Sequence, residues 1–328
     1  MAPALPYIDL PLEIPIPGLT HLPEAVHGVP ILGSIFTVGH PPSIKLFGIL
    51  VAFGVWLGSV VAMRHARERN IDDKKMSEFI FFTIGFGFVG AHVLDAIFYH
   101  PDAVARDPFY ILKLWEGISS YGGFIGAGIA AYVWRYRHKQ NILNFCECIN
   151  SAFPLAWVFG RLGCSSVHDH PGKESTSWLA VKYPHLPEGV GKFDLGLLEF
   201  FYAVPMAIIF LILWRRRPDR PLGFYTGWMC VCYAPVRFCL DFLREEGKLE
   251  SDPRYGGLTP AQWACFALVI FGAYFIRLSM RGGSSMEPER KDDDAPSDDE
   301  DDDDDADDEA EVVVAKPKPA RKRRRRPA

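Results

Sequence analysis

Residues 145–172 read FCECINSAFPLAWVFGRLGCSSVHDHPG. The part up to Gly163 is mostly apolar, whereas the part that follows is a short loop rich in His, Asp and Gly. Arg161 stands where the two parts meet. A charged side chain at the end of an apolar helix is costly in lipid unless it faces a cavity, a partner or the interface. Arg161 is therefore a candidate functional residue, and an arginine that only extends its head group to the membrane surface is the alternative.

Seven apolar stretches follow one another along the 328 residues, of which 49% are hydrophobic. Each is long enough to cross a hydrocarbon core of roughly 30 Å as a helix. The sequence therefore predicts an all-α, polytopic membrane protein with about seven transmembrane helices, at residues 44–63, 79–98, 117–134, 145–164, 195–214, 222–242 and 260–276. The third and fourth stretches are the weakest, because polar side chains interrupt them: Ser119, Ser120, Tyr121, Glu147, Asn150 and Arg161.

Basic residues predict the orientation of these helices. Clusters of Lys and Arg follow the first, third, fifth and seventh stretches, at 64–75, 135–139, 215–220 and 277–281. By the positive-inside rule these connections are cytoplasmic, so the N-terminus is outside and the C-terminus cytoplasmic. The expected domains are a periplasmic segment (1–43), a transmembrane domain (44–280) with a periplasmic cap (165–194), and a cytoplasmic tail (281–328). Residues 1–43 contain no Lys or Arg, so a cleaved signal peptide is not expected.

The predicted tail is acidic first and basic at its end. From Glu287 onward there are 17 acidic and 10 basic residues, and the rest of the chain has 23 acidic and 25 basic residues. Such a segment buries too little apolar surface to offset chain entropy, so we expect a disordered, solvated tail. Its basic end is also suited to anionic lipid. Nucleic acid is not an expected partner, because the acidic run competes for the same cations.

On this topology, polar residues from five stretches reach one depth in the outer half of the membrane: His92, Asp95, Ser119, Ser120, Tyr121, Arg161, Glu199, Arg237 and Asp241. Such a ring suggests a cavity that opens toward the outer leaflet. Paired arginines suit a phosphate, because each guanidinium is a planar fork of donors that keeps its charge. The natural anion at that depth is a phospholipid head group. In the alternative, Arg161 pairs with Asp169 and Arg237 with Asp241 only to hold helices together.

Several motifs resemble the bacterial prolipoprotein diacylglyceryl transferase family over roughly residues 42–280. They are Tyr121-Gly122-Gly123, Gly160-Arg161-Leu162-Gly163 with Gly172 nine residues later, Glu199, and Arg237-Phe238 with Asp241 and Arg244. Members of that family move the diacylglyceryl group of phosphatidylglycerol to the thiol of a lipobox cysteine in a secreted precursor, and they release glycerol phosphate. The resemblance implies the same reaction here, in a bacterial inner membrane, with phosphatidylglycerol and a prolipoprotein signal peptide as partners and no cofactor.

The resemblance also implies roles for individual residues. Arg161 and Arg237 match the two essential arginines of the family, Asp169 aligns with a signature glutamate, and Gly172 aligns with the closing glycine of the signature. Glu199 matches the glutamate that ends the family's H-P-x-Q-L-Y-E stretch. The implied substrate-binding set is Arg161, Arg237, Glu199, Gly122, Gly123, Gly172, Asp241, Arg244 and His92.

The chain departs from the family pattern at its signature, which reads G-R-x-G-N-F-x-N-G-E. Cys164 and Val167 replace the two asparagines, Ser165 replaces the phenylalanine, and His168 replaces the glycine. The histidine that usually precedes the Gly-Gly pair is Tyr121 here. Because that histidine is a candidate base in the family, this chain requires another base or a changed reaction.

The loop after the fourth stretch supplies candidates for the missing base. His168 and His170 flank Asp169, and an imidazole that titrates near neutrality can accept the proton of a thiol. The expected catalytic set is therefore Arg161, Arg237, Tyr121, Asp169, His168 and His170, with Tyr121 as a hydrogen-bonding group that orients the lipid.

Two other functions fit the same residues. Zinc ligand types gather in this region: Cys164, His168, Asp169, His170 and His185. Their spacing matches no specific metal motif, so no metal is predicted, and a membrane metalloenzyme is the less favoured alternative. The replaced asparagines and histidine also fit a catalytically altered or inactive paralogue that binds phospholipid or lipoprotein precursors.

Overall fold

The computed structural model describes residues 3, 5–8, 13–15, 43–113, 117–245 and 254–281. Most of the predicted segment 1–43, and the predicted tail apart from Arg281, lie outside the described residues.

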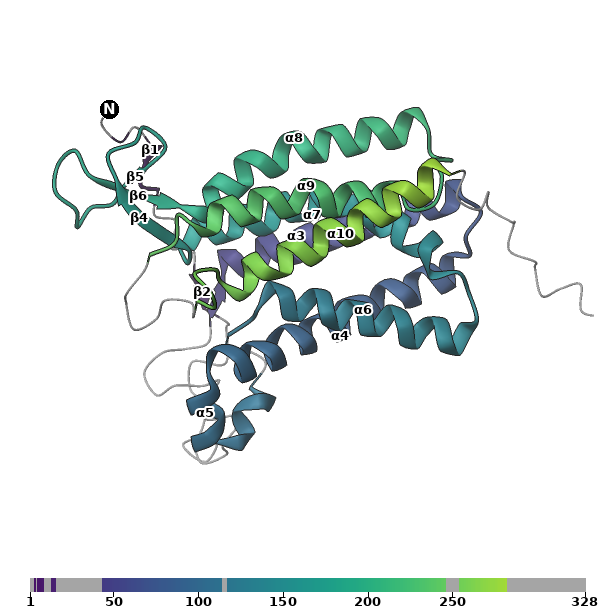
Figure 1. Ribbon diagram of the computed structural model, residues 1–328, viewed down its shortest axis with the longest axis horizontal. Coiled ribbons are helices and arrows are strands. Elements are labelled where there is room, and N and C mark those ends of the chain that lie inside the picture. Colours follow the sequence, from purple (N-terminus) through teal and green to yellow (C-terminus); the bar gives the residue numbers. More distant parts are fainter. Residues whose placement is uncertain are drawn as a thin grey trace, which may run out of the picture. The chain divides into compact units, whose positions relative to one another are not determined.

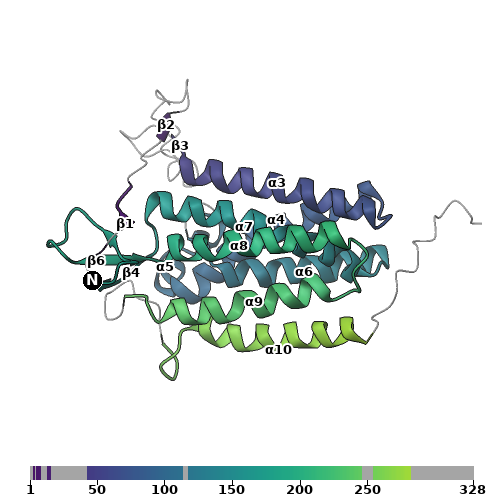
Figure 2. The ribbon, with the colours of Figure 1, turned by 90° about the horizontal axis from the view of Figure 1, so that it is seen from above.

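Seven long helices make up most of the described part of the chain, and each contains one of the predicted apolar stretches or most of it. They lie side by side with their axes in the same general direction (Figures 1 and 2). They are α3 (Leu46–Glu68), α4 (Asp73–Tyr99), α6 (Ser120–His138), α7 (Ile142–Val167), α8 (Leu195–Arg216), α9 (Phe224–Asp241) and α10 (Pro260–Met280). Two short helices, α5 (Pro101–Arg106) and the 3-10 helix η1 (Pro108–Leu112), lie between α4 and α6.

Five of these helices are long and apolar enough to cross a membrane: α3, α4, α7, α8 and α10. This makes the chain a multi-pass membrane protein. The third predicted span, α6, falls short as expected, because glycines and two arginines lower its hydropathy. The fourth, α7, meets the criterion although we expected it to be weak, and α9 falls short because it carries Arg237, Asp241 and several polar aromatics. Seven spans and the orientation of the termini stay predictions.

The helices pack in pairs, chiefly α3 with α7, α4 with α6, α7 with α8, and α9 with α10. Glycine makes the α4–α6 contact possible. A Cβ atom on Gly90 would lie 2.7 Å from the carbonyl oxygen of Gly122 and 2.8 Å from the Cα atom of Gly126. The two backbones therefore touch, and the helices form a closely packed hairpin. Few contacts join this hairpin to α3 and α7, and it lies below the other helices in the view of Figure 1.

A small β-sheet occupies the predicted cap. Its strands are β4 (Pro171–Ser175), β5 (Val181–Lys182), β6 (Gly191–Asp194) and the N-terminal β1 (Leu5–Pro6), in the order β1-β5-β6-β4. β1 runs parallel to β5, and the other pairs are antiparallel. A separate antiparallel pair joins β2 (Glu13–Pro15) to β3 (Ser43–Lys45). The all-α prediction missed these strands, and the cap begins after Val167 because α7 continues to that residue. We call the end of the bundle that carries β4–β6 the cap end.

A buried carboxylate holds the opposite end of the bundle together. Glu147 of α7 accepts hydrogen bonds from the backbone amides of Tyr225 (2.8 Å) and Thr226 (3.0 Å) in the first turn of α9. These amides have no partner within their own helix, and the helix dipole favours a negative charge beside them. The polar residue that interrupts the fourth apolar stretch is thus an N-terminal cap supplied by a neighbouring helix.

Candidate functional site

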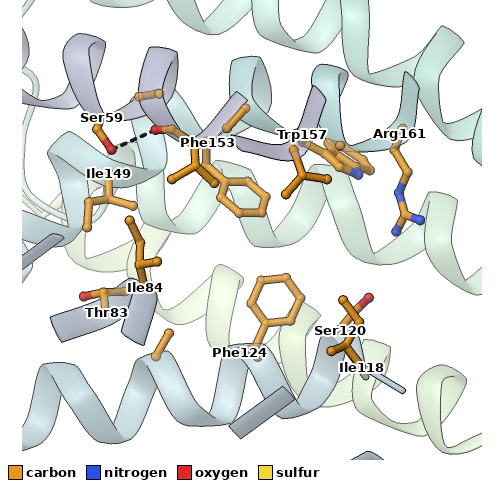
Figure 3. A pocket seen from close by; sticks show the side chains of 18 of the residues that line it. Ser59, Thr83, Ile84, Ile118, Ser120, Phe124, Ile149, Phe153, Trp157 and Arg161 are labelled. Carbon is orange, nitrogen blue, oxygen red and sulfur yellow. Dashed lines mark hydrogen bonds between the residues drawn. The ribbon is translucent and has the colours of Figure 1, made fainter. Parts of the chain in front are cut away.

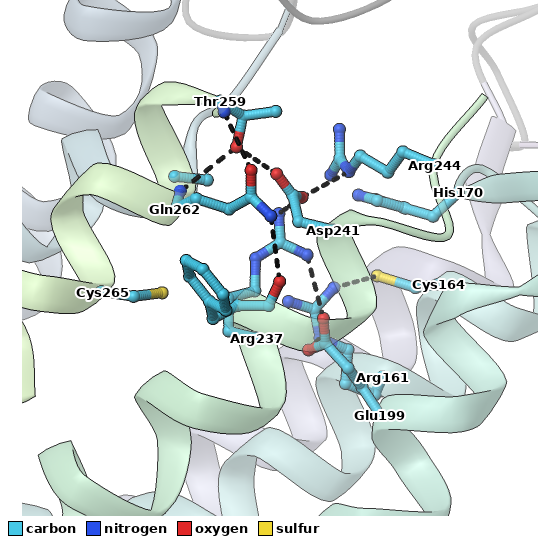
Figure 4. Close-up of polar contacts among 12 residues, drawn as sticks. Arg161, Cys164, His170, Glu199, Arg237, Asp241, Arg244, Thr259, Gln262 and Cys265 are labelled. Carbon is cyan, nitrogen blue, oxygen red and sulfur yellow. Dashed lines mark hydrogen bonds and ion pairs between the residues drawn. The ribbon is translucent and has the colours of Figure 1, made fainter. Parts of the chain in front are cut away.

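Two arginines and one glutamate from three helices meet at the cap end. Arg161 Nε of α7 lies 2.6 Å from Glu199 Oε2 of α8, and Arg237 Nη1 of α9 lies 3.2 Å from Glu199 Oε1 (Figure 4). The Glu199 side chain is 1% exposed, so water cannot replace these contacts. The two guanidinium groups are therefore neighbours, as the sequence predicts, and a single buried carboxylate lies between them.

Further ion pairs extend this cluster toward α10. Arg237 Nη2 lies 3.3 Å and Arg244 Nε 3.0 Å from Asp241 Oδ1. The hydroxyl of Thr259 donates to the other oxygen of Asp241, and Thr259 also begins α10 in a capping box with Gln262. Three guanidinium groups thus gather around two carboxylates at the cap end.

A cavity of about 640 Å³ runs between α3, α4, α6 and α7 and ends at Arg161. Most of its wall is apolar: Val51, Val55, Ile80, Ile84, Phe124, Ile149, Phe153, Ala156 and Trp157. The hydroxyls of Ser59 and Thr83 also line it, but each donates to a carbonyl one turn back in its own helix. Figure 3 shows Arg161 pointing into the cavity at one end. The shape and lining suit a molecule with apolar chains and one anionic head.

A second group of reactive side chains stands at the same end of the cavity. Cys164, Asp169 and His170 all line it together with Arg161. Arg161 Nη1 lies 3.7 Å from Cys164 Sγ, and His170 Nδ1 lies 2.5 Å from Asp169 Oδ1. Cys164 is buried, whereas Asp169 and His170 are about one-third exposed. Potential ligand atoms of Cys164, Asp169 and His170 all lie within 4.8 Å of one another.

Comparison with known proteins assigns the family. Residues 34–278 match the model of the prolipoprotein diacylglyceryl transferase family. The chain belongs to this family. It is 26% identical over 250 residues to the phosphatidylglycerol–prolipoprotein diacylglyceryl transferase of Haemophilus influenzae, which covers 74% of this chain and 91% of that protein. Proteins of the same name from Chromohalobacter salexigens (29% over 224 residues, 66% of this chain and 79% of that protein) and Actinobacillus pleuropneumoniae (27% over 251 residues, 70% and 92%) are also similar.

Among the arginines of the described residues, Arg161 lines the cavity. Arg237 is not among the cavity-lining residues and stands behind Glu199, with its side chain 8% exposed. The predicted pair between Arg237 and Asp241 is present, whereas the carboxylate that holds Arg161 is Glu199 rather than Asp169. The two arginines therefore have different positions: Arg161 lines the cavity, whereas Arg237 pairs with Glu199 outside the cavity lining.

His168, one of the two predicted bases, lies in the cap. Its Nδ1 atom is 2.6 Å from Asp194 Oδ2, its Nε2 atom is 3.2 Å from the carbonyl oxygen of Ile8, and its ring stacks on Tyr7. Burial raises the pKa of Asp194, although the Leu197 amide and the His168 ring act in the opposite direction. Both ring nitrogens of His168 are thus engaged away from the cavity, which argues against a role as base and leaves His170.

His92 also lies apart from the cavity. Its ring nitrogens are 3.0 Å from the carbonyl oxygen of Gly117 and 3.1 Å from that of Tyr110. The buried imidazole fastens the connection between α4 and α6. These contacts do not support the substrate-binding role that the resemblance implies for His92.

Tyr121 joins two helices. Its hydroxyl donates to the carbonyl oxygen of Ala261 at 2.8 Å and lies 3.5 Å from Cys265 Sγ, so it links α6 to α10. Its donor proton points to a carbonyl rather than to the cavity. The predicted role of Tyr121 as an orienting group for lipid is therefore not supported by its contacts.

The three predicted glycines serve different purposes. Gly123 lines the cavity, whereas a Cβ atom on Gly122 would lie 2.9 Å from the Cα atom of Ala91. Gly172 forms a β-bridge with Arg244, and a Cβ atom there would lie 2.6 Å from the Leu243 carbonyl oxygen. Gly172 thus lets the cap approach the segment that carries Arg244.

Sequence reasoning missed Thr259 and Gln262, which anchor the Asp241 end of the cluster. A signal was present, because Thr259-Pro260-Ala261-Gln262 is a capping-box pattern before an apolar stretch. What the pattern does not reveal is that the same Thr hydroxyl also donates to Asp241 on another helix.

Proposed function

We propose that this family member transfers the diacylglyceryl group of phosphatidylglycerol to the lipobox cysteine thiol of prolipoproteins. The observation that carries the proposal is Arg161, paired with Glu199 and Arg237, at the polar end of an apolar cavity. The names of the similar proteins support the same substrates.

The cavity and the arginine cluster bind different parts of the lipid. The acyl chains occupy the apolar space between α3, α4, α6 and α7, and the phosphate lies against Arg161. Arg161, which lines the cavity, supplies the positive charge that faces the phosphodiester. Because Glu199 already orients both guanidinium groups, they lose little side-chain freedom when lipid binds.

The transfer is an attack of sulfur on the glyceryl carbon that bears the phosphate. The S–C bond forms while the C–O bond breaks, and the phosphate leaves with the electron pair as glycerol phosphate. Arg161 stabilises the charge that develops there, an effect worth about 3 to 4 kcal/mol for a single donor in a water-excluded site.

A group must also accept the proton of the acceptor thiol. Asp169 accepts from His170 Nδ1 and so leaves the Nε2 atom of His170 free to act as the base.

The cap end is proposed to face the periplasm, where secreted precursors emerge. Lys and Arg together outnumber Asp and Glu at the opposite end, in the segments 64–75, 135–139 and 215–220. By the positive-inside rule that end is cytoplasmic. The proposed setting is thus the bacterial inner membrane, with seven spans and the N-terminus outside.

One observation favours a second candidate, a paralogue that binds phospholipid without transferring it. Cys164, which lines the polar end of the cavity, and Val167 stand where the family signature has asparagines. Such a protein would keep the cavity and the arginine cluster and lack turnover.

A complementation experiment separates the two candidates. The gene is expressed in a bacterium depleted of its own transferase, and lipoprotein maturation is followed by the mobility and mass of a marker lipoprotein. Restored maturation that is lost in Arg161→Ala supports the transferase. Normal membrane insertion without maturation, together with binding of phosphatidylglycerol by the purified protein, supports the paralogue.

A further inference from the structure

We propose that the floor of the cavity limits the length of the acyl chain that this protein accepts. We define the floor as Ala62 of α3, Ile80 of α4 and Ile149 of α7, which line the cavity and belong to one buried apolar core or pack against it. Figure 3 shows Ile149 at the end of the cavity opposite Arg161. The inference rests on the proposed function for the identity of the lipid, and bound lipid tests it without any transfer.

Three aromatic rings close the cavity beneath the floor. Phe79 of α4, Trp134 of α6 and Phe145 of α7 are each at most 2% exposed. The ring centroid of Trp134 lies 5.1 Å from that of Phe79 and 4.6 Å from that of Phe145. The core that contains these rings has residues from all four helices around the cavity. Protein interiors of this kind are close-packed, so a chain that reaches the floor has no space ahead of it.

The depth of the cavity matches the length of one acyl chain. Ile149 lies twelve residues before Arg161 on α7, which is roughly 18 Å at about 1.5 Å per residue. Because two leaflets share a hydrocarbon core of roughly 30 Å, one acyl chain spans about 15 Å on average. With its phosphate beside Arg161, the lipid therefore fills the cavity with its glyceryl group and one whole chain, and little depth remains.

The deep part of the cavity offers a chain no polar partner that would favour one length. The hydroxyl of Thr83, which lines this part, donates to the carbonyl oxygen of Phe79 at 2.7 Å. A lipid that moves from the bilayer into the cavity exchanges one apolar environment for another, so each added methylene group gains little. Methylene groups forced against a close-packed floor, in contrast, weaken binding by about 5- to 150-fold. The floor thus sets an upper limit on chain length.

The test is a competition between chain lengths in one sample. Full-length protein is placed in phosphatidylcholine nanodiscs that contain equal amounts of phosphatidylglycerol with lauroyl, myristoyl, palmitoyl and stearoyl chains. The mass of the lipobox peptide after transfer shows which diacylglyceryl group it received. Because all lipids compete for the same molecules of enzyme, the ratio of products does not depend on the amount of folded protein.

Two variants change the depth of the cavity in opposite directions. Ala62→Leu raises the floor and should lower the ratio of stearoyl to myristoyl product at least fivefold. Ile149→Ala deepens the cavity and should raise that ratio. The matched controls are Ala267→Leu and Ile270→Ala on α10, because both side chains are exposed and neither lines the cavity. The controls should keep the native ratio.

A second measurement needs no turnover. Each purified protein is equilibrated with the same lipid mixture, and the chain length of the phosphatidylglycerol that it retains is measured by mass. An unchanged chain length in Ile149→Ala, which removes atoms and adds none, overturns the length limit even if Ala62→Leu does not fold. Native transfer with unchanged product ratios in both variants overturns the limit and leaves the proposed function standing. A shift in retained lipid without transfer by the native protein supports the limit and overturns the proposed function.

Discussion

Replacing Arg161 by lysine keeps the positive charge and removes the planar fork. The native guanidinium contacts Glu199 through Nε and Cys164 through Nη1 while it points into the cavity. A lysine has a single nitrogen and cannot hold Glu199 and a phosphate in the same way. The loss of one hydrogen bond to a charged group costs about 1.5–3 kcal/mol. At about 1.36 kcal/mol per tenfold change in rate, we expect kcat/KM for lipid transfer to fall roughly 10- to 150-fold.

The assay measures transfer from phosphatidylglycerol in nanodiscs to a lipobox peptide, followed by the mass of the peptide. Arg67→Lys is the matched control, because Arg67 is exposed and pairs with Asp73 at the end of the bundle opposite the cap. The control should keep full activity, and both variants should keep the unfolding temperature within a few degrees. Activity of Arg161→Lys within about twofold of the native protein would refute the idea that the fork binds the phosphate.

Three further changes probe the packing around the site. Glu199→Gln leaves two buried guanidinium groups without their shared counter-charge. Because breaking a buried ion pair costs about 3–5 kcal/mol, the unfolding temperature in detergent should drop. An unchanged unfolding temperature would contradict the buried cluster. Gly126→Ala puts a methyl group 3.1 Å from the Cα atom of Gly90 and should lower the stability and yield of the folded protein, whereas Gly128→Ala faces open space and should not. Tyr121→Phe removes one hydrogen bond and should cost about 0.5–1.5 kcal/mol of stability while transfer stays within about threefold; a larger loss of transfer would show that the hydroxyl acts on lipid.

The helices were predictable because apolar stretches of membrane length have few other structures available to them. Their ends were less predictable. α4 begins at Asp73, six residues before the apolar stretch, because Asp72 accepts from the Lys75 amide and caps a polar first turn. The strands of the cap were missed because they are two to five residues long, and β1 pairs with a segment far away in the sequence.

The candidate site was predictable in part, for a physical reason. Charges inside apolar stretches are few, and they must find one another or a cavity, so the meeting of Arg161 and Arg237 followed from topology. The sequence did not predict which arginine Glu199 contacts, because Glu199 is equally far from Arg161 and Arg237 along the chain. Imidazoles were the hardest to place. His168 and His170 are two residues apart, yet the left-handed backbone at His168 (φ 49°) accompanies a ring directed into the cap, and only His170 lines the cavity.

The carboxylate of Glu147 has a consequence for the far end of the bundle. It grips the first amides of α9, and Arg237 lies twelve residues after Tyr225, roughly 18 Å further along the same helix. A slip of α9 by one residue would shift Arg237 by about 1.5 Å and would also break the grip at Glu147. Because α7 and α9 are held in register at both ends, the spacing of the Arg161 and Arg237 guanidinium groups does not depend on a bound lipid. We therefore expect a substitution of Glu147 to weaken binding of the lipid phosphate, although Glu147 lies at the other end of the bundle.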